Sequence, residues 1–220
     1  MALEVEKQSV RKRRVVIEAA TGVFLDKGYD STTMDDVAAR AGVSKATVYK
    51  HFVDKEQLFA TIVAATTNQV DSLVTELAAK LANTRDVELD LADLARQFLA
   101  TLMQPRVLQL RRLVIANADR FPDVARMWYA QGFERVLAAL ATCFEGLADD
   151  GKLNMDDPLL AANHFAGLLL WIPINRAMFA GRVHVKAEAD VDRHVRAAVR
   201  AFLDGYGGRR PARPRRPRRS

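Results

Sequence analysis

Cysteine is almost absent from this 220-residue sequence, in which Cys143 stands alone. A lone cysteine excludes an internal disulfide framework and any zinc site built on thiolate pairs, and it fits a reducing compartment. The first fifteen residues, MALEVEKQSVRKRRV, lack the apolar core of a secretion signal. The longest stretch without an acid or a base, residues 158–175, carries Asn163, His164 and Pro173, which favours a buried or interface helix over a membrane span. We therefore expect a soluble, cytoplasmic protein with no membrane partner.

Catalytic motifs are missing as well. The sequence has no glycine-rich phosphate loop, no nucleophile elbow and no catalytic dyad spacing. His164, His184 and His194 lack both the spacing of metal ligands and an accompanying cluster of carboxylates. We expect no enzyme, no metal site and no cofactor.

Negative charge is missing from the carboxyl-terminal end. The last twelve residues, RRPARPRRPRRS, hold seven of the 33 Lys and Arg residues and no acid. Residues 1–208 therefore hold 26 bases against 27 acids, so the sequence pI of about 9.7 comes from this tail. Composition alone does not make the folded part a nucleic-acid binder. Because the tail offers almost nothing to bury, we expect residues 207–220 to be disordered.

Apolar residues recur with helical spacing along nearly the whole chain. No stretch sustains a period of two, so we predict an all-α fold. Gly28 and Gly42 are typical of residues that end helices, and Pro105, Pro122 and Pro158 stand where a first helical turn tolerates proline. The expected helices cover residues 9–27, 34–41, a short segment after Ser44, 54–82, 86–103, 105–118, 122–148, 158–180 and 188–206.

The stretch YDSTTMDDVAARAGVSKATVYKHFVDKEQLF, residues 29–59, has the pattern of a helix-turn-helix, with the motif itself at about residues 32–51. Thr33 and Asp36 form a variant of the capping box, and Ser44 caps the second short helix. Small and branched residues would let the two helices cross closely, namely Val37, Ala38, Ala41, Val43, Val48 and Phe52.

The second short helix separates into two faces at about 100° per residue. Val48 and Phe52 point into a small core. The opposite side and its flanks hold residues suited to a major groove and its phosphate walls, namely Ala46, Thr47 and Lys50, then Lys45, Tyr49 and His51, with Lys55 just beyond. Similar helix pairs occur in proteins that never touch DNA, in which Val48, Tyr49 and Phe52 would simply be core.

The run from about residue 10 to residue 59 resembles the amino-terminal DNA-binding domain of the TetR/AcrR family of bacterial transcription regulators. The resemblance rests on Ala20, Phe24, Gly28, Tyr29, Thr32, Thr33, the run AARAGVSKATVYKHF from Ala38 to Phe52, and Lys55, Glu56, Leu58 and Phe59. It implies a homodimer whose two helix-turn-helix units enter successive major grooves of a pseudo-palindromic double-stranded DNA operator. The positions that it places at DNA are Thr33, Ser44, Lys45, Ala46, Thr47, Tyr49, Lys50, His51 and Lys55. Ala46 stands where many relatives have glycine, which concerns base preference rather than docking.

We expect three parts in the chain: a helix-turn-helix domain at residues 9–59, a larger helical ligand-binding and dimerisation domain at 60–206, and the tail at 207–220. Residues 106–181 resemble AcrR-type regulatory domains, which in this family bind a small molecule. The resemblance also implies a homodimer through the last two long helices. Their apolar faces are wider than one core needs and favour such a four-helix interface, with Leu160, Leu168, Leu169 and Ile172 on one helix and Val191, Val195, Val199 and Phe202 on the other.

Mostly apolar walls with a few amides predict a pocket for a small lipophilic effector. The candidates are Phe98, Leu102, Met103, Val114, Asn117, Met127, Trp128, Phe133, Asn163, Phe165, Trp171 and Asn175. Core packing is the alternative for each of them. Arg111 and Arg112 could hold an acidic group, although a solvated face is the simpler interpretation.

The sequence thus predicts a ligand-responsive transcription regulator, most simply a repressor released from its operator by the effector. One alternative is a regulator of broad DNA specificity without an inducer, aided by the basic tail. A second is a ligand-binding helical protein whose helix-turn-helix is vestigial. The tail itself could add non-specific DNA affinity, which we favour, or hold an anionic membrane or protein, or have no role.

Overall fold

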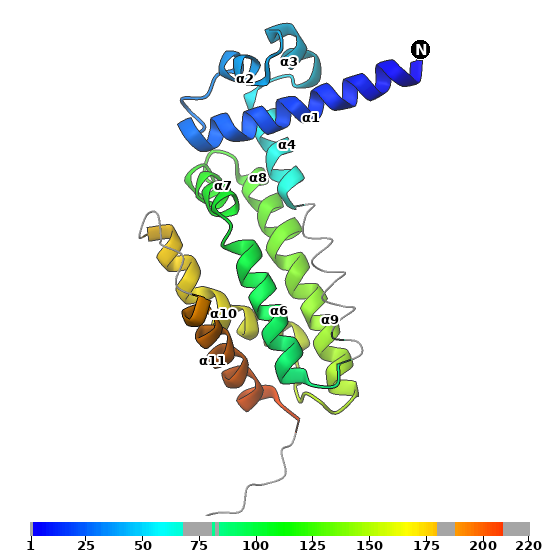
Figure 1. The fold of residues 1–220 in the computed structure, drawn as a ribbon, viewed down its shortest axis with the longest axis vertical. Coiled ribbons are helices and arrows are strands. Elements are labelled where there is room, and N and C mark those ends of the chain that lie inside the picture. The colour runs from blue at the N-terminus through cyan, green and yellow to red at the C-terminus, as the bar shows by residue number, and fades with distance from the viewer. Residues whose placement is uncertain (1, 68–80, 82–83, 180–187, 209–220) are drawn as a thin grey trace, which may run out of the picture. The chain divides into compact units, whose positions relative to one another are not determined.

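The computed structural model describes residues 2–67, 81, 84–179 and 188–208 (Figure 1). Within these ranges the regular elements are helices apart from one isolated bridge between Leu153 and Gly207, which confirms the all-α prediction. The helices are α1 (Ala2–Lys27), α2 (Met34–Ala41), α3 (Lys45–His51), α4 (Lys55–Thr67), α6 (Val87–Leu102), α7 (Pro105–Ala116), α8 (Pro122–Trp128), the π-helix η1 (Tyr129–Glu134), α9 (Arg135–Asp149), α10 (Pro158–Phe179) and α11 (Glu188–Tyr206). None of the helices placed here has the length and hydropathy needed to cross a membrane.

Two helices differ from the expected boundaries. Helix α1 begins at Ala2 instead of residue 9, because residues such as Ala, Leu, Glu and Lys favour helix without any apolar pattern to reveal it. The single helix expected at 122–148 is instead α8 and α9 joined by the π-helix η1, a widened turn that apolar spacing does not encode. The expected helix at 54–82 is seen as α4, and its remainder lies outside the described residues except for Leu81.

The chain separates into two compact units. The first unit contains residues 1–70 and 104–133, and the second unit contains residues 71–103 and 134–220. Helices α7 and α8 therefore pack with the amino-terminal helices.

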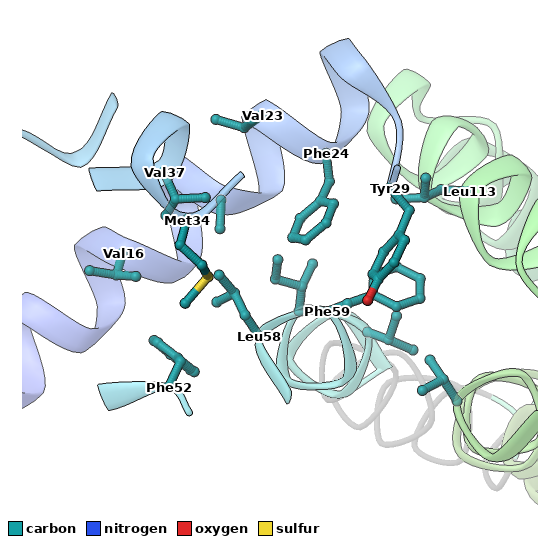
Figure 2. Close-up of a cluster of buried hydrophobic side chains, with 14 of the residues drawn as sticks. Val16, Val23, Phe24, Tyr29, Met34, Val37, Phe52, Leu58, Phe59 and Leu113 are labelled. Atoms are coloured by element: carbon teal, nitrogen blue, oxygen red, sulfur yellow. The ribbon is translucent and has the colours of Figure 1, made fainter. Parts of the chain in front are cut away.

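The first unit is built on an aromatic core between α1, α4 and the segment before α8. Figure 2 shows the side chains of Phe24, Tyr29 and Phe59 turned toward one another. The ring centroids lie 5.7 Å apart for Phe24 and Tyr29 and 5.4 Å apart for Tyr29 and Phe59, and Phe121 approaches Tyr29 to 4.7 Å. Ring contacts of this kind add to the apolar burial and fix the turn after α1.

The second unit is a helical bundle in which α10 packs on α9 and α11, and α11 packs on α6. Phe144, Phe165 and Phe202 meet at its centre, with ring centroids 5.1–5.8 Å apart. Val195, Val199 and Phe202 are buried inside the subunit, so this part of the apolar face expected to need a partner is used by the subunit's own core. Leu169 is likewise buried.

Helix α10 keeps a second apolar face exposed. Its exposed side chains are Leu160, Leu168, Trp171, Ile172 and Phe179. Trp171 is 72% exposed.

The end of α11 is held against the loop before α10. The N–H of Asn154 donates to the Tyr206 carbonyl at 2.8 Å, and the N–H of Gly208 donates to the Lys152 carbonyl at 2.9 Å. Gly207 and Gly208 were grouped with the tail from sequence, but these backbone contacts hold them in place. The rest of the expected disordered tail, residues 209–220, lies outside the described residues.

Candidate nucleic-acid interface

Hydrogen bonds at both ends define helix α2. The Asp36 N–H donates to Thr33 Oγ1 at 3.1 Å, and the Thr33 N–H donates to Asp36 Oδ2 at 3.0 Å, so the expected capping box is confirmed. The Lys27 ammonium donates to Asp36 Oδ1 at 2.7 Å, and this bond, together with those from Thr33, lowers the pKa of Asp36 to about 2. At the other end Gly42 has φ of 64°, a left-handed conformation that lets the chain turn sharply into α3.

Helix α3 has one buried and one exposed face. Val48 and Phe52 are 0% and 1% exposed, which confirms that they belong to the core. The other predicted positions on or before this helix are exposed for Ser44, Lys45, Ala46, Tyr49 and Lys50 and half-buried for Thr47 and His51. Ser44 caps the helix, because its Oγ accepts from the Thr47 N–H at 3.2 Å.

Lys45 and Asp35 form an ion pair across the turn, with Nζ and Oδ2 2.9 Å apart. The carboxylate of Asp35 raises the pKa of Lys45, so this lysine is charged at neutral pH. Both side chains are exposed, and an exposed pair is weak. A phosphate group could therefore replace Asp35 as the partner of Lys45 at small cost.

His51 lies where the basic start of α1 meets the end of α3. Burial lowers the pKa of His51, and the positive charges of Lys50, Arg13 and Lys12 lower it further. The Arg13 guanidinium also lies 5.3 Å from the centre of the Phe52 ring. Residues from both helices thus share one positively charged surface beside the exposed face of α3.

Lys55 differs from the other predicted positions in having its ammonium turned toward the protein. Its Nζ lies 2.8 Å from the Tyr29 carbonyl oxygen, 3.0 Å from that of Thr32 and 3.3 Å from that of Asp30. It also lies 4.4 Å from the centre of the Tyr29 ring. Lys55 is only partly exposed.

The predicted effector residues fall in both units. Val114, Asn117, Met127, Trp128 and Phe133 belong to the first unit, whereas Phe98, Leu102, Met103, Asn163, Phe165, Trp171 and Asn175 belong to the second. Each of the three amides donates to a carbonyl of its own helix, Asn117 to Leu113 at 2.8 Å, Asn163 to Leu159 at 2.9 Å and Asn175 to Trp171 at 2.7 Å. Phe98, Val114 and Phe165 are buried, the outcome that core packing also gives. Their contact with an effector stays a prediction.

Sequence reasoning missed two ion pairs that fasten residues 104–133 to the amino-terminal helices. Arg106 pairs with Glu18, and Arg120 pairs with Asp30 at 2.6 Å. The partners are 88 and 90 positions apart in the chain, and no local pattern links residues at that separation.

An open groove of about 600 Å³ lies beside the Arg106–Glu18 pair, between α1, α2 and α7. None of the predicted effector residues lines it. Within the described part of the chain, no group of His, Cys, Asp and Glu side chains is arranged to hold a metal ion.

Two family models match the chain. Residues 16–62 match the bacterial regulatory proteins of the tetR family, and residues 90–208 match the AefR-like transcriptional repressor, C-terminal domain. These two matches correspond to the helix-turn-helix and to most of the helices that follow it.

Solved structures and curated proteins give the same similarity. A protein of Mesorhizobium loti described as a TetR-family transcriptional regulator is 49% identical, with a TM-score of 0.85 over 90% of this chain and 98% of that chain. The Flavonoid-responsive Regulator FrrA is 32% identical, with a TM-score of 0.71 over 91% of this chain and 99% of that chain. The HTH-type transcriptional activator FasR of Mycolicibacterium smegmatis is 40% identical over 75 residues, which are 34% of this chain and 33% of that protein.

Proposed function

The chain belongs to the TetR family of bacterial transcription regulators, and on that premise we propose that it binds a pseudo-palindromic operator as a homodimer and represses transcription until a small lipophilic effector releases it. Membership of this family makes it a DNA-binding regulator and not an enzyme. The observation that carries the proposal is the two-sided helix α3, with Val48 and Phe52 buried and a polar, basic side exposed. It acts in the cytoplasm, where the operator is.

In the complex, α3 enters the major groove. Ala46 permits close approach, the Thr47 hydroxyl and methyl groups meet a base edge, and Lys50 donates to guanine acceptors. The remaining predicted positions bind the phosphates on either side, namely Thr33, Ser44, Lys45, Tyr49 and His51. Their exposure and the positive surface around His51 support this division of roles.

The homodimer forms through α10 and α11. The exposed apolar face of α10 supports this, because Trp171 and Leu168 would lose contact with water in a four-helix interface. A two-fold dimer presents two copies of α3, so the half-sites lie about one helical turn of DNA apart, or a multiple of it.

The effector binds among the predicted apolar and amide residues and shifts the population toward a conformer that no longer fits adjacent grooves. The printed name of FrrA, a 32% identical protein, describes a response to flavonoids, which supports a lipophilic effector for this chain. Repression is supported by the match to an AefR-like repressor domain over residues 90–208. A coupling of about 1–3 kcal/mol between effector and operator is enough for regulation.

The structure offers a route for that coupling. Val114, Asn117 and Met127 lie on the segment 104–133, which the Arg106–Glu18 and Arg120–Asp30 pairs join to α1 and the turn after it. A displacement of this segment therefore reaches α1 directly, in addition to any route through the long helix that starts after Asp54.

The test is operator binding by variants of the exposed face. Tyr49→Ala and Lys50→Ala are each expected to weaken operator affinity by about 5- to 150-fold, the cost of one good base or phosphate contact. Fluorescence anisotropy on a labelled operator duplex and on a random duplex measures both affinity and selectivity. Unchanged binding would favour the vestigial helix-turn-helix, and equal affinities for the two duplexes would favour the regulator of broad specificity aided by the basic tail.

A further inference from the structure

Lys55 connects the beginning of α4 to the turn that precedes α2. An ammonium group has three N–H donors, and the carbonyls of Tyr29, Asp30 and Thr32 provide three acceptors within 3.3 Å. The Tyr29 ring, 4.4 Å away, covers the same charge. The protein itself thus saturates this ammonium.

The three carbonyls belong to the segment that sets where α2 begins. Thr32 is 1% exposed, and its hydroxyl donates to the Gly28 carbonyl at 2.7 Å. Thr33 follows directly as the N-cap of α2. On the other side of the motif, α3 ends at His51 and α4 starts at Lys55. Lys55 therefore closes a bridge between the entry to the helix-turn-helix and its exit.

We propose that Lys55 serves DNA recognition as a positioning residue, which holds α2 and α3 at the correct angle on α4, and that it does not bind a DNA phosphate. This inference rests on the proposed operator binding. If the ammonium turned to a phosphate, three carbonyls in a partly buried turn would lose their donor, a cost that a free surface lysine does not have. Lys45, which is exposed and pairs only with exposed Asp35 among the printed contacts, has no such obligation and serves as the matched control.

Salt dependence separates the two roles. Each phosphate contact adds about 0.9 to the slope of log affinity against log salt concentration, so a contact made in both subunits adds about 1.8. The experiment compares the wild type, Lys55→Met and Lys45→Met. Dissociation constants for the operator and for a random duplex are measured at several salt concentrations, at a temperature where circular dichroism shows every variant folded.

For Lys55→Met we expect operator affinity to fall about tenfold, with the affinity for random DNA and the salt slope unchanged. Lys45→Met should lower the slope by about 1.8. If Lys55→Met lowers the slope and both affinities as Lys45→Met does, Lys55 is a phosphate ligand and the proposal is overturned. If only the melting temperature falls and the folded variant keeps its operator affinity, Lys55 is merely structural, which overturns the proposal equally.

A second variant covers the case in which Lys55→Met does not fold. Lys55→Gln removes the charge but keeps two N–H donors for the carbonyls. The proposal predicts an unchanged salt slope for this variant, and a slope lowered by about 1.8 contradicts it. A wild type that does not prefer the operator to random DNA would instead contradict the proposed function, so the two failures are distinguishable.

Discussion

Arg106 and Glu18 form a bidentate ion pair between α7 and α1, with Nη1–Oε1 at 2.7 Å and Nη2–Oε2 at 2.8 Å. The hydrogen bonds from Arg106 lower the pKa of Glu18, and those to Glu18 raise the pKa of Arg106. A bidentate pair fixes orientation as well as distance. This contact joins the segment that carries several predicted effector residues to the helix on which the DNA-binding motif rests.

A double-mutant cycle measures this link. Because both side chains are more than half exposed, we expect Glu18→Gln and Arg106→Gln to show a coupling of only about 0.2–1 kcal/mol in the free energy of unfolding. Urea denaturation of the wild type, both single variants and the double variant gives the value, which should shrink at high salt. Additive effects of the two substitutions would mean that the pair contributes nothing to stability.

Gly42 tests the turn between α2 and α3. Gly42→Ala should lower the free energy of unfolding by about 1–2 kcal/mol, because alanine resists the φ of 64° found here. The control is Gly146→Ala in α9, where alanine should raise stability by up to about 1 kcal/mol through its helix propensity. Neither added methyl group meets an atom within 4 Å, so thermal denaturation of the two variants isolates the backbone effect. Equal effects of the two substitutions would contradict this account of the turn.

The dimer proposal depends on the exposed face of α10. Replacing both Leu168 and Trp171 by Glu should convert the dimer into a monomer, because two charges cannot be buried unpaired in an apolar interface. Operator affinity should then fall by at least about a hundredfold, because the two half-sites are no longer bound together. Leu89→Glu is the control, since Leu89 is an exposed leucine on α6. A double variant that still sediments as a dimer would place the interface elsewhere.

His51 gives a prediction for pH. Its lowered pKa leaves it neutral at pH 7 in the free protein, whereas a phosphate beside it in the complex would raise that pKa. The complex then binds more protons than the free protein, so operator affinity should increase as pH falls from about 7.5 to 5.5, by up to about tenfold per unit for each histidine. In the absence of DNA the sign is opposite, because the unfolded chain binds the proton more readily and stability falls as pH drops through about 6.5.

Anisotropy titrations across this pH range, with His51→Gln and His164→Gln, test that prediction. The first variant should lose most of the pH dependence of operator affinity. The second, on exposed α10, should keep it. If His51→Gln retains the full dependence, His51 does not lie at a phosphate.

The fold was predictable from sequence wherever the signal was local. Thr33 with Asp36, Gly42 and Ser44 are short-range signals, and the structure places each where the pattern predicts it. The alternation of buried Val48 and Phe52 with exposed Lys50 follows in the same way from helical geometry.

What sequence did not predict depends on contacts between distant segments. The orientation of the Lys55 ammonium is decided by carbonyls more than twenty positions earlier in the chain. Likewise, the apolar residues of α11 look the same in sequence whether they face the subunit's own core or a partner, and only packing shows that Val195, Val199 and Phe202 are used internally. The effector residues are harder still, since an apolar or amide side chain carries no local mark of what it contacts.

The most direct test of the central claim is selection of bound DNA from a random pool at about 0.15 M salt, where binding carried by phosphate contacts alone is already weakened. The full chain is compared with a version ending at Gly208, which lacks the seven arginines of the tail. The account predicts that both versions enrich the same inverted repeat, with half-sites about one helical turn apart or a multiple of it. No enriched sequence, together with binding that disappears when the tail is removed, would contradict it.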